Sequence, residues 1–254
     1  MIESLYIAET GLNSQQKMID VISNNIANIS TPGYKKANVS FAELVTPVPA
    51  DALQEAITDS GKGVHVASVQ LDFRSGELKQ TGHPMDLAIN GEGFLAVEML
   101  DGETGYSRAG RLRIADDGFL TTQDGLRLQP GIQVPPESTD LTVTQSGNVL
   151  ARVQGSAELI ELGQLEVARF AQPEALRAVG SNVFKASEQA GAMTAGAAGT
   201  NGNGMLVQGF AEMANVSMNE EMVSLMLAQR GYQLNARLVQ VADQVLETIN
   251  NIRR

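Results

Sequence analysis

The sequence has no cysteine and no tryptophan, and only 4% of its residues are aromatic. Without cysteine the chain can form no disulfide, no thiolate metal site and no cysteine nucleophile. Because aromatics are so few, the core of a 254-residue chain must be mostly aliphatic. Lys and Arg number 18 against 29 Asp and Glu, a net charge of −11. This balance argues against nucleic acid as a partner, because nucleic-acid surfaces need clustered cations.

Long apolar runs are also missing. No stretch of about 18 apolar residues occurs, so we expect no membrane insertion. The N-terminus has two early acids, Glu3 and Glu9, and no basic segment followed by an apolar run. It is therefore not a secretory signal peptide, and we expect any export to proceed without a cleaved signal.

Residues that could support catalysis are few and scattered. His65 and His83 have no partner at metal-ligand spacing. The glycines that flank Lys62 and Glu92 do not continue into a phosphate-binding motif. No Ser–His–acid spacing stands out. We therefore expect no catalytic residue, no cofactor and no metal, and predict that the protein is not an enzyme.

The charge is unevenly distributed along the chain. Residues 1–40 contain equal numbers of acids and bases, and so do residues 215–254. The middle, residues 41–214, therefore carries the whole −11. The two ends are thus neutral overall, whereas the middle is strongly acidic, which indicates that the ends and the middle form different parts of the structure.

The N-terminal segment has the spacing of a coiled-coil helix. Its stripe follows alternating steps of three and four residues: Leu5, Ala8, Leu12, Gln15, Ile19, Ile22, Ile26 and Ile29. Thr31-Pro32-Gly33 should end the helix, because proline disfavours helix at the residue before it. Asn24, Asn25 and Asn28 crowd its end. They can simply be the polar, turn-forming residues that are common at a helix end. Alternatively, their amide hydrogen bonds can fix the register between packed helices.

The C-terminal segment predicts a second, longer helix. Ser217 to Glu220 fits a capping box, and no proline follows before Ile252. About 35 helical residues would span roughly 50 Å. One apolar stripe consists of Val223, Leu227, Leu234, Leu238, Val241, Val245 and Ile249, and a second consists of Leu225, Ala228, Tyr232, Val239, Ala242 and Leu246. Two stripes predict neighbours on two sides.

Between the helices the apolar period shortens to that of strands. Short alternating runs are separated by Asn-Gly, Asp-Gly and Ser-Gly turns, which are strong hairpin signals. We predict an α+β fold with paired coiled-coil-like terminal helices, extended connectors and a central antiparallel all-β domain, a sandwich or a barrel. The expected boundaries are 1–40 for the first helix, 41–68 for a connector, 69–185 for the β domain, 186–214 for a Gly/Ala-rich connector, and 215–254 for the second helix.

Four motifs together resemble the bacterial flagellar basal-body rod and hook protein family. The first is QQKMIDVISNNIANISTPGYK at residues 15–35. The second is GELKQTGHPMDLAINGEGF at 76–94, followed by YSRAG at 106–110. The others are QGFAEMANV at 208–216 and EEMVSLMLAQRGY at 220–232. The likeness covers almost the whole chain and is closest to the distal-rod members. Gly231 stands where the family usually has alanine, which should weaken the second helix.

The resemblance implies a structural subunit that polymerises through its terminal helices into a hollow helical drive shaft, which transmits torque and carries the export channel. It implies a basal-body location in a rod that spans the periplasm. The implied partners are further copies of the chain, proximal-rod and hook-type axial proteins, outer-membrane and peptidoglycan ring proteins, the rod cap and the export apparatus. The expected assembly interface comprises Leu5, Leu12, Ile19, Ile22, Asn24, Asn25, Ile26, Asn28, Val223, Leu227, Leu234, Leu238, Val241 and Val245.

Two alternatives remain open. The segment 46–62 is shorter than the usual distal-rod arm, so the chain could be another axial paralogue, the large proximal-rod protein. The second alternative is a different class of protein, a glycan-binding module or enzyme. In that case the β domain would bind or convert the glycan, and the helices would only form oligomers.

Overall fold

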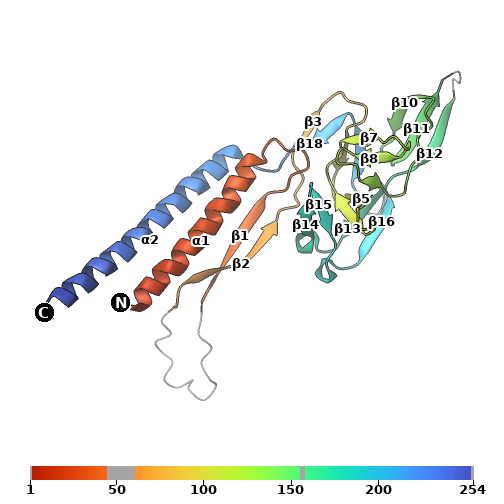
Figure 1. Cartoon of the computed structure of the whole chain (residues 1–254). Helices are drawn as coiled ribbons and strands as arrows, with labels where there is room; N and C mark the ends of the chain where they lie inside the picture. Colours follow the sequence, from red (N-terminus) through yellow and green to blue (C-terminus); the bar gives the residue numbers. More distant parts are fainter. Residues whose placement is uncertain (1, 45–60, 155–157, 253–254) are drawn as a thin grey trace, which may run out of the picture. The chain divides into compact units, whose positions relative to one another are not determined.

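The computed structural model describes residues 2–44, 61–154 and 158–252, which form two units (Figure 1). The helical unit consists of Met1–Ala27, Ala37–Leu71 and Ser217–Arg254, and the β unit consists of Asn28–Lys36 and Asp72–Val216. The two terminal helices and the antiparallel strands between them confirm the α+β class.

The helical unit is built on two long antiparallel helices that lie side by side in Figure 1, α1 (Ile2–Ala27) and α2 (Met218–Ile252). Helix α2 begins directly after Ser217, where the capping box was expected. Helix α1 ends at Ala27, because a turn closed by the Thr31 N–H on the Asn28 carbonyl follows it. Ile29, the last member of the predicted stripe, therefore lies outside the helix. No helix among the described residues combines the length and apolarity needed to cross a membrane.

The first predicted connector, 41–68, differs from expectation. Its residues 45–60 lie outside the described part of the chain. On either side of them, β1 (Ala37–Glu43) and β2 (Val64–Leu71) form an antiparallel hairpin that packs against α1. Val64, Val66 and Ser68 alternate with exposed residues. This period of two is the pattern of a half-buried strand.

The β unit contains several small sheets around one core. Its strands are β3 (Leu78–Gln80), β4 (Leu87–Asn90), β5 (Phe94–Glu98), β6 (Thr104–Ser107), β7 (Leu112–Ile114), β8 (Leu120–Thr122), β9 (Arg127–Leu128), β10 (Ser138–Val143), β11 (Asn148–Val153), β12 (Leu159–Gln164), β13 (Glu166–Phe170), β14 (Arg177–Gly180), β15 (Val183–Lys185), β16 (Met193–Ala197), β17 (Met205–Gln208) and β18 (Phe210–Glu212). The largest sheet runs in the order β14-β15-β6-β5-β9-β8-β7, with β13 and β16 joined to it through β5. A three-stranded sheet, β10-β11-β12, and the pairs β17-β4 and β18-β3 complete the unit.

Most of the predicted turns join paired strands. Asp101-Gly102 connects β5 to β6, Asp117-Gly118 connects β7 to β8, and Asp124-Gly125 connects β8 to β9. Ser146-Gly147 connects β10 to β11. The exception is Asn90-Gly91, because the strand before it, β4, pairs with β17 rather than with the strand that follows.

The second predicted connector, 186–214, also differs from expectation, because it forms three strands. Strand β16 pairs with β13, β17 with β4, and β18 with β3. The glycines and alanines of this segment show little hydrophobic period. Their backbone groups nevertheless complete the ladders of strands far earlier in the chain, and Leu206 enters the core at 1% exposure.

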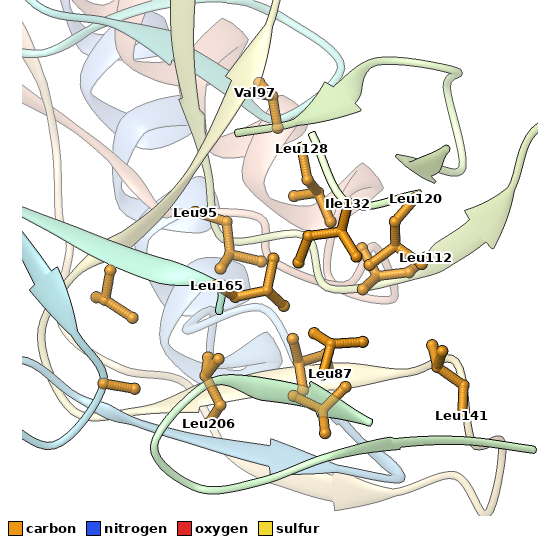
Figure 2. Packing of buried hydrophobic residues seen from close by; sticks show 14 of the residues in the cluster. Leu87, Leu95, Val97, Leu112, Leu120, Leu128, Ile132, Leu141, Leu165 and Leu206 are labelled. Carbon is orange, nitrogen blue, oxygen red and sulfur yellow. The ribbon is translucent and has the colours of Figure 1, made fainter. Parts of the chain in front are cut away.

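The core of the β unit is aliphatic, as the scarcity of aromatics requires. Figure 2 shows leucines, an isoleucine and a valine from well-separated parts of the chain meeting in one cluster, among them Leu87, Leu95, Leu165 and Leu206. Burying a side chain of this kind contributes about 1.5–3 kcal/mol. The β unit therefore has a hydrophobic core of its own.

Candidate assembly surface

The two apolar stripes of α2 lie in different environments. In the second stripe, Ala228 is 2% exposed and Leu225, Val239 and Ala242 are half-buried, while Tyr232 and Leu246 are each 39% exposed. We call the other stripe the open stripe: all its members are exposed, Val223, Leu227, Leu234, Leu238, Val241, Val245 and Ile249. Leu227 and Leu234 are 62% and 61% exposed. The helical unit thus covers most of the second stripe and leaves the other open.

Single exposed leucines are common on protein surfaces, but a continuous apolar row is not. The open stripe repeats every three, four or seven residues over most of a 35-residue helix. Full burial of each Val or Leu side chain would add about 1.5–3 kcal/mol. A surface of this kind is typical of an interaction face.

The α1 members of the expected interface are more covered than those of α2. Ile22 is buried, and Leu5, Leu12, Ile19 and Ile26 are half-buried. They belong to a helix that packs on α2 and on the β1–β2 hairpin. Much of their apolar surface is therefore already used within the chain.

One part of the α1–α2 seam remains hollow. Leu5, Tyr6, Glu9 and Leu12 of α1 and Val239 of α2 line a depression of about 450 Å³. Tyr6 is 49% exposed. Sequence reasoning missed Tyr6 and placed Val239 only in the second stripe, because neither pattern shows where two helices leave a gap.

The three asparagines at the end of α1 have separate environments. Asn25 is 1% exposed, and its Nδ2 donates to the Ala37 carbonyl at 2.9 Å and to Glu221 Oε2 at 3.1 Å. Its Oδ1 accepts the Ala37 N–H at 3.0 Å. Asn25 thereby joins α1, β1 and the first turn of α2. Asn24 is exposed on α1, and Asn28 accepts a hydrogen bond from Thr31 within the β unit.

Two glycines set the approach of the helices. A Cβ on Gly11 would lie 2.6 Å from Asn235 Nδ2, and one on Gly231 would lie 3.1 Å from the end of Gln15. Each glycine thus faces an amide side chain of the opposite helix. The close approach of Gln15 explains why position 231 holds a glycine, although glycine lowers helix propensity.

Catalytic chemistry gains no support from the β unit. A cavity of about 760 Å³ in this unit is lined by several charged groups that already form ion pairs. Glu92 pairs with Arg169 at 2.9 Å, Asp72 with Arg74 at 2.5 Å, and Arg108 with Glu212 at 3.0 Å. The described residues include no group of three His, Asp or Glu that could hold a metal ion. His65 and His83 are exposed.

Three family models match the chain. Residues 5–35 match "Flagella basal body rod protein", residues 88–151 match "Flagellar hook protein FlgE/F/G D1 domain", and residues 207–252 match "Flagellar basal body rod FlgEFG protein C-terminal". These segments cover most of α1, nearly all of the stretch from β4 to β11, and the whole of α2.

Full-length relatives agree with the models. The chain is similar to the flagellar basal-body rod protein FlgG of Borreliella burgdorferi, at 36% identity over 100% of both chains. It is 35% identical to FlgG of Caulobacter vibrioides, over 99% of this chain and 100% of that protein. It is 33% identical to FlgG of Bacillus subtilis over the full length of both. This chain belongs to the flagellar basal-body rod protein family.

Proposed function

We propose that this chain is a structural subunit of the distal flagellar rod that polymerises through its terminal helices. The observation that carries the proposal is the open stripe of α2, which the subunit exposes along a helix within a family of rod proteins. A hollow, torque-transmitting shaft that carries the export channel is the assembly that the family resemblance implies. Several relatives of matching length, at 33–36% identity, bear the name FlgG, which favours the distal rod over the large proximal-rod paralogue.

The geometry of the two surfaces favours an open polymer over a closed dimer. The open stripe and the hollow at Leu5, Tyr6 and Leu12 are different patches of the same unit. A contact between two different patches repeats from copy to copy and builds a helical filament when the rotation does not close. We propose that apolar side chains of the open stripe of one copy pack into the hollow of the next. The α1 residues Ile19, Ile22, Asn24, Asn25, Ile26 and Asn28 of the expected interface then support this face by fixing the end and the packing of α1.

The remaining partners and the location belong to the same proposal. Membership of the rod family places the protein in the flagellar basal body, together with other axial components. We propose contacts with proximal-rod and hook-type proteins at the two ends of its segment, with ring proteins around it, and with the rod cap during growth. We also propose that the protein is exported through the flagellar apparatus, the route that the family resemblance implies.

The test replaces two members of the open stripe with charge. Leu234→Glu with Leu238→Glu should leave the monomer folded, because both side chains are exposed. The pair should abolish rods, because assembly would bury two unpaired carboxylates. The matched control is Gln233→Glu with Gln240→Glu, which adds the same charge at exposed positions of α2 outside both stripes.

Electron microscopy of purified basal bodies and swimming of cells that carry each variant measure the outcome. Circular dichroism of the monomers verifies the fold. We expect normal rods with the glutamine-derived control and none with the leucine-derived pair. Normal rods with both variants would refute the role of the open stripe.

A further inference from the structure

The chain passes between the helical unit and the β unit at four points, after residues 27, 36, 71 and 216. Three segments of the β unit therefore adjoin these crossings: 28–36, 72–76 and 212–216. Any force that passes along the backbone from one unit to the other must enter the β unit through these segments. Their hydrogen bonds decide whether they respond to force together or separately.

Asn215 holds all three segments together. Its Oδ1 accepts the Lys36 N–H at 2.8 Å. Its Nδ2 donates to the Asp72 carbonyl at 2.8 Å and to the Arg74 carbonyl at 3.1 Å. The Asp72 N–H in turn donates to the Lys36 carbonyl at 2.8 Å. One amide side chain thus bridges the residues next to three of the four crossings.

A buried ion cluster lies deeper in the same segments. Glu212 Oε1 lies 2.7 Å from Lys35 Nζ, and its Oε2 lies 3.0 Å from Arg108 Nε. The side chains of Lys35 and Glu212 are fully buried, and that of Arg108 is 2% exposed. Burial lowers the pKa of Lys35 below its ordinary value, and the neighbouring Arg108 charge acts in the same direction. Removing one partner of such a pair is costly because it leaves a buried charge uncompensated.

Further hydrogen bonds tie this cluster to the neighbouring backbone. The Lys35 ammonium donates to the Arg74 carbonyl at 2.8 Å, and the Gly76 N–H donates to Glu212 Oε1 at 2.9 Å. Arg108, which follows β6, donates from Nη2 to the Gly91 carbonyl at 2.6 Å. The three crossing segments are thereby linked, through Arg108, to residues that directly follow β4 and β6.

We propose that Asn215 and the Lys35–Glu212–Arg108 cluster form a mechanical clamp, which makes the crossing segments carry torque together into the β unit. The inference rests on the proposed function, because only a subunit of a rotating shaft experiences such a load. A stretch whose hydrogen bonds are loaded in parallel resists more force than one whose bonds open in turn. The clamp serves load transmission, whereas the open stripe serves assembly.

The test weakens the clamp at Asn215 and leaves the ion cluster intact. Asn215→Asp keeps the acceptor for Lys36 and removes both donated bonds, and Asn215→Ala removes all three without adding charge. The control is Asn90→Asp, the same change at an exposed residue of the β unit. In the monomer, exchange of the Lys36 amide should become about tenfold faster with Asn215→Ala, which removes its acceptor, a factor equivalent to about 1.4 kcal/mol of local protection. Asn215→Asp, which keeps that acceptor, should accelerate it less.

In cells, both Asn215 variants should build rods of normal number and length and rotate normally in dilute medium. Rotation should then fall below that of the control as the viscosity of the medium rises. Unchanged amide exchange, unchanged rotation across the viscosity series, or loss of rods with a folded monomer would each overturn the clamp. Absence of the wild-type protein from purified basal bodies would instead overturn the proposed function, so the two failures are distinguishable.

Discussion

At the scale of single residues, each of two glycines faces an amide side chain of the opposite helix across the α1–α2 seam. Gly231 faces the end of Gln15, whose Oε1 is buried without a hydrogen-bond partner among the described residues. Gly11 faces Asn235 at a shorter distance. The two glycines therefore make different predictions for the same substitution.

Gly231→Ala should stabilise the helical unit by about 0.5–1 kcal/mol. The added methyl needs the Gln15 amide to move by a few tenths of an ångström, and this movement breaks no bond to its Oε1. Gly11→Ala should gain less or lose stability, because its Cβ would lie 2.6 Å from Asn235 Nδ2. Urea unfolding followed by far-ultraviolet circular dichroism measures both changes. A lower midpoint for Gly231→Ala than for Gly11→Ala would contradict this account of the seam.

Residue roles could be predicted from sequence only where a local pattern encodes them. For the asparagines that crowd the end of α1, the sequence left two interpretations, helix-end polarity or register-fixing amides, and Asn25 joins α1 to Glu221 of α2. The Lys35–Glu212–Arg108 cluster could not be predicted, because its members are separated by more than 70 residues. A buried ion pair has no periodicity, and its three charges look like solvated ones in the sequence.

At the scale of elements, the helices were the most predictable, because a stripe with a period near 3.5 is repeated many times along each of them. The β1–β2 hairpin and β16 to β18 were missed for the opposite reason. They are short, and the Gly/Ala-rich strand β16 is held by backbone ladders to β13, whose sequence lies some 25 residues earlier. Strand pairing of this kind depends on the partner, which no local pattern reveals.

Two neighbouring residues of α2 test the division between its stripes. Ala228→Glu should destabilise the monomer by about 2 kcal/mol or more, because Ala228 is 2% exposed and glutamate would bring both bulk and charge into the seam. Leu227→Glu, one residue earlier on the open stripe, should change monomer stability by less than about 0.5 kcal/mol. Thermal unfolding of the two variants measures the difference. Equal losses would mean that the open stripe is covered within the subunit.

At the scale of the whole molecule, the acidic stretch of the sequence does not coincide with either of the two units. The net −11 lies in residues 41–214, but the structure assigns residues 41–71 to the helical unit together with the two neutral ends. The acidic residues are thus not confined to the β unit. The neutral ends remain the surfaces where stacked copies would repel one another least.

The two units should also differ in stability before assembly. The β unit has a large aliphatic core, whereas α2 exposes a whole stripe, and its residues 243–249 are all exposed. Long helices depend on tertiary burial for most of their stability. In the dilute monomer, amides of α2 beyond about Asp243 should therefore exchange fastest, and those of β5 and β11 should exchange slowest.

Polymerisation should reverse this order for α2, because neighbouring copies would then cover the open stripe. Hydrogen exchange measured by mass spectrometry on the monomer and on isolated basal bodies compares the two states. The core strands serve as the internal reference, since assembly changes their burial least. Strong protection of the last turns of α2 in the dilute monomer would contradict the prediction, because the stripe would then need no second copy to become ordered.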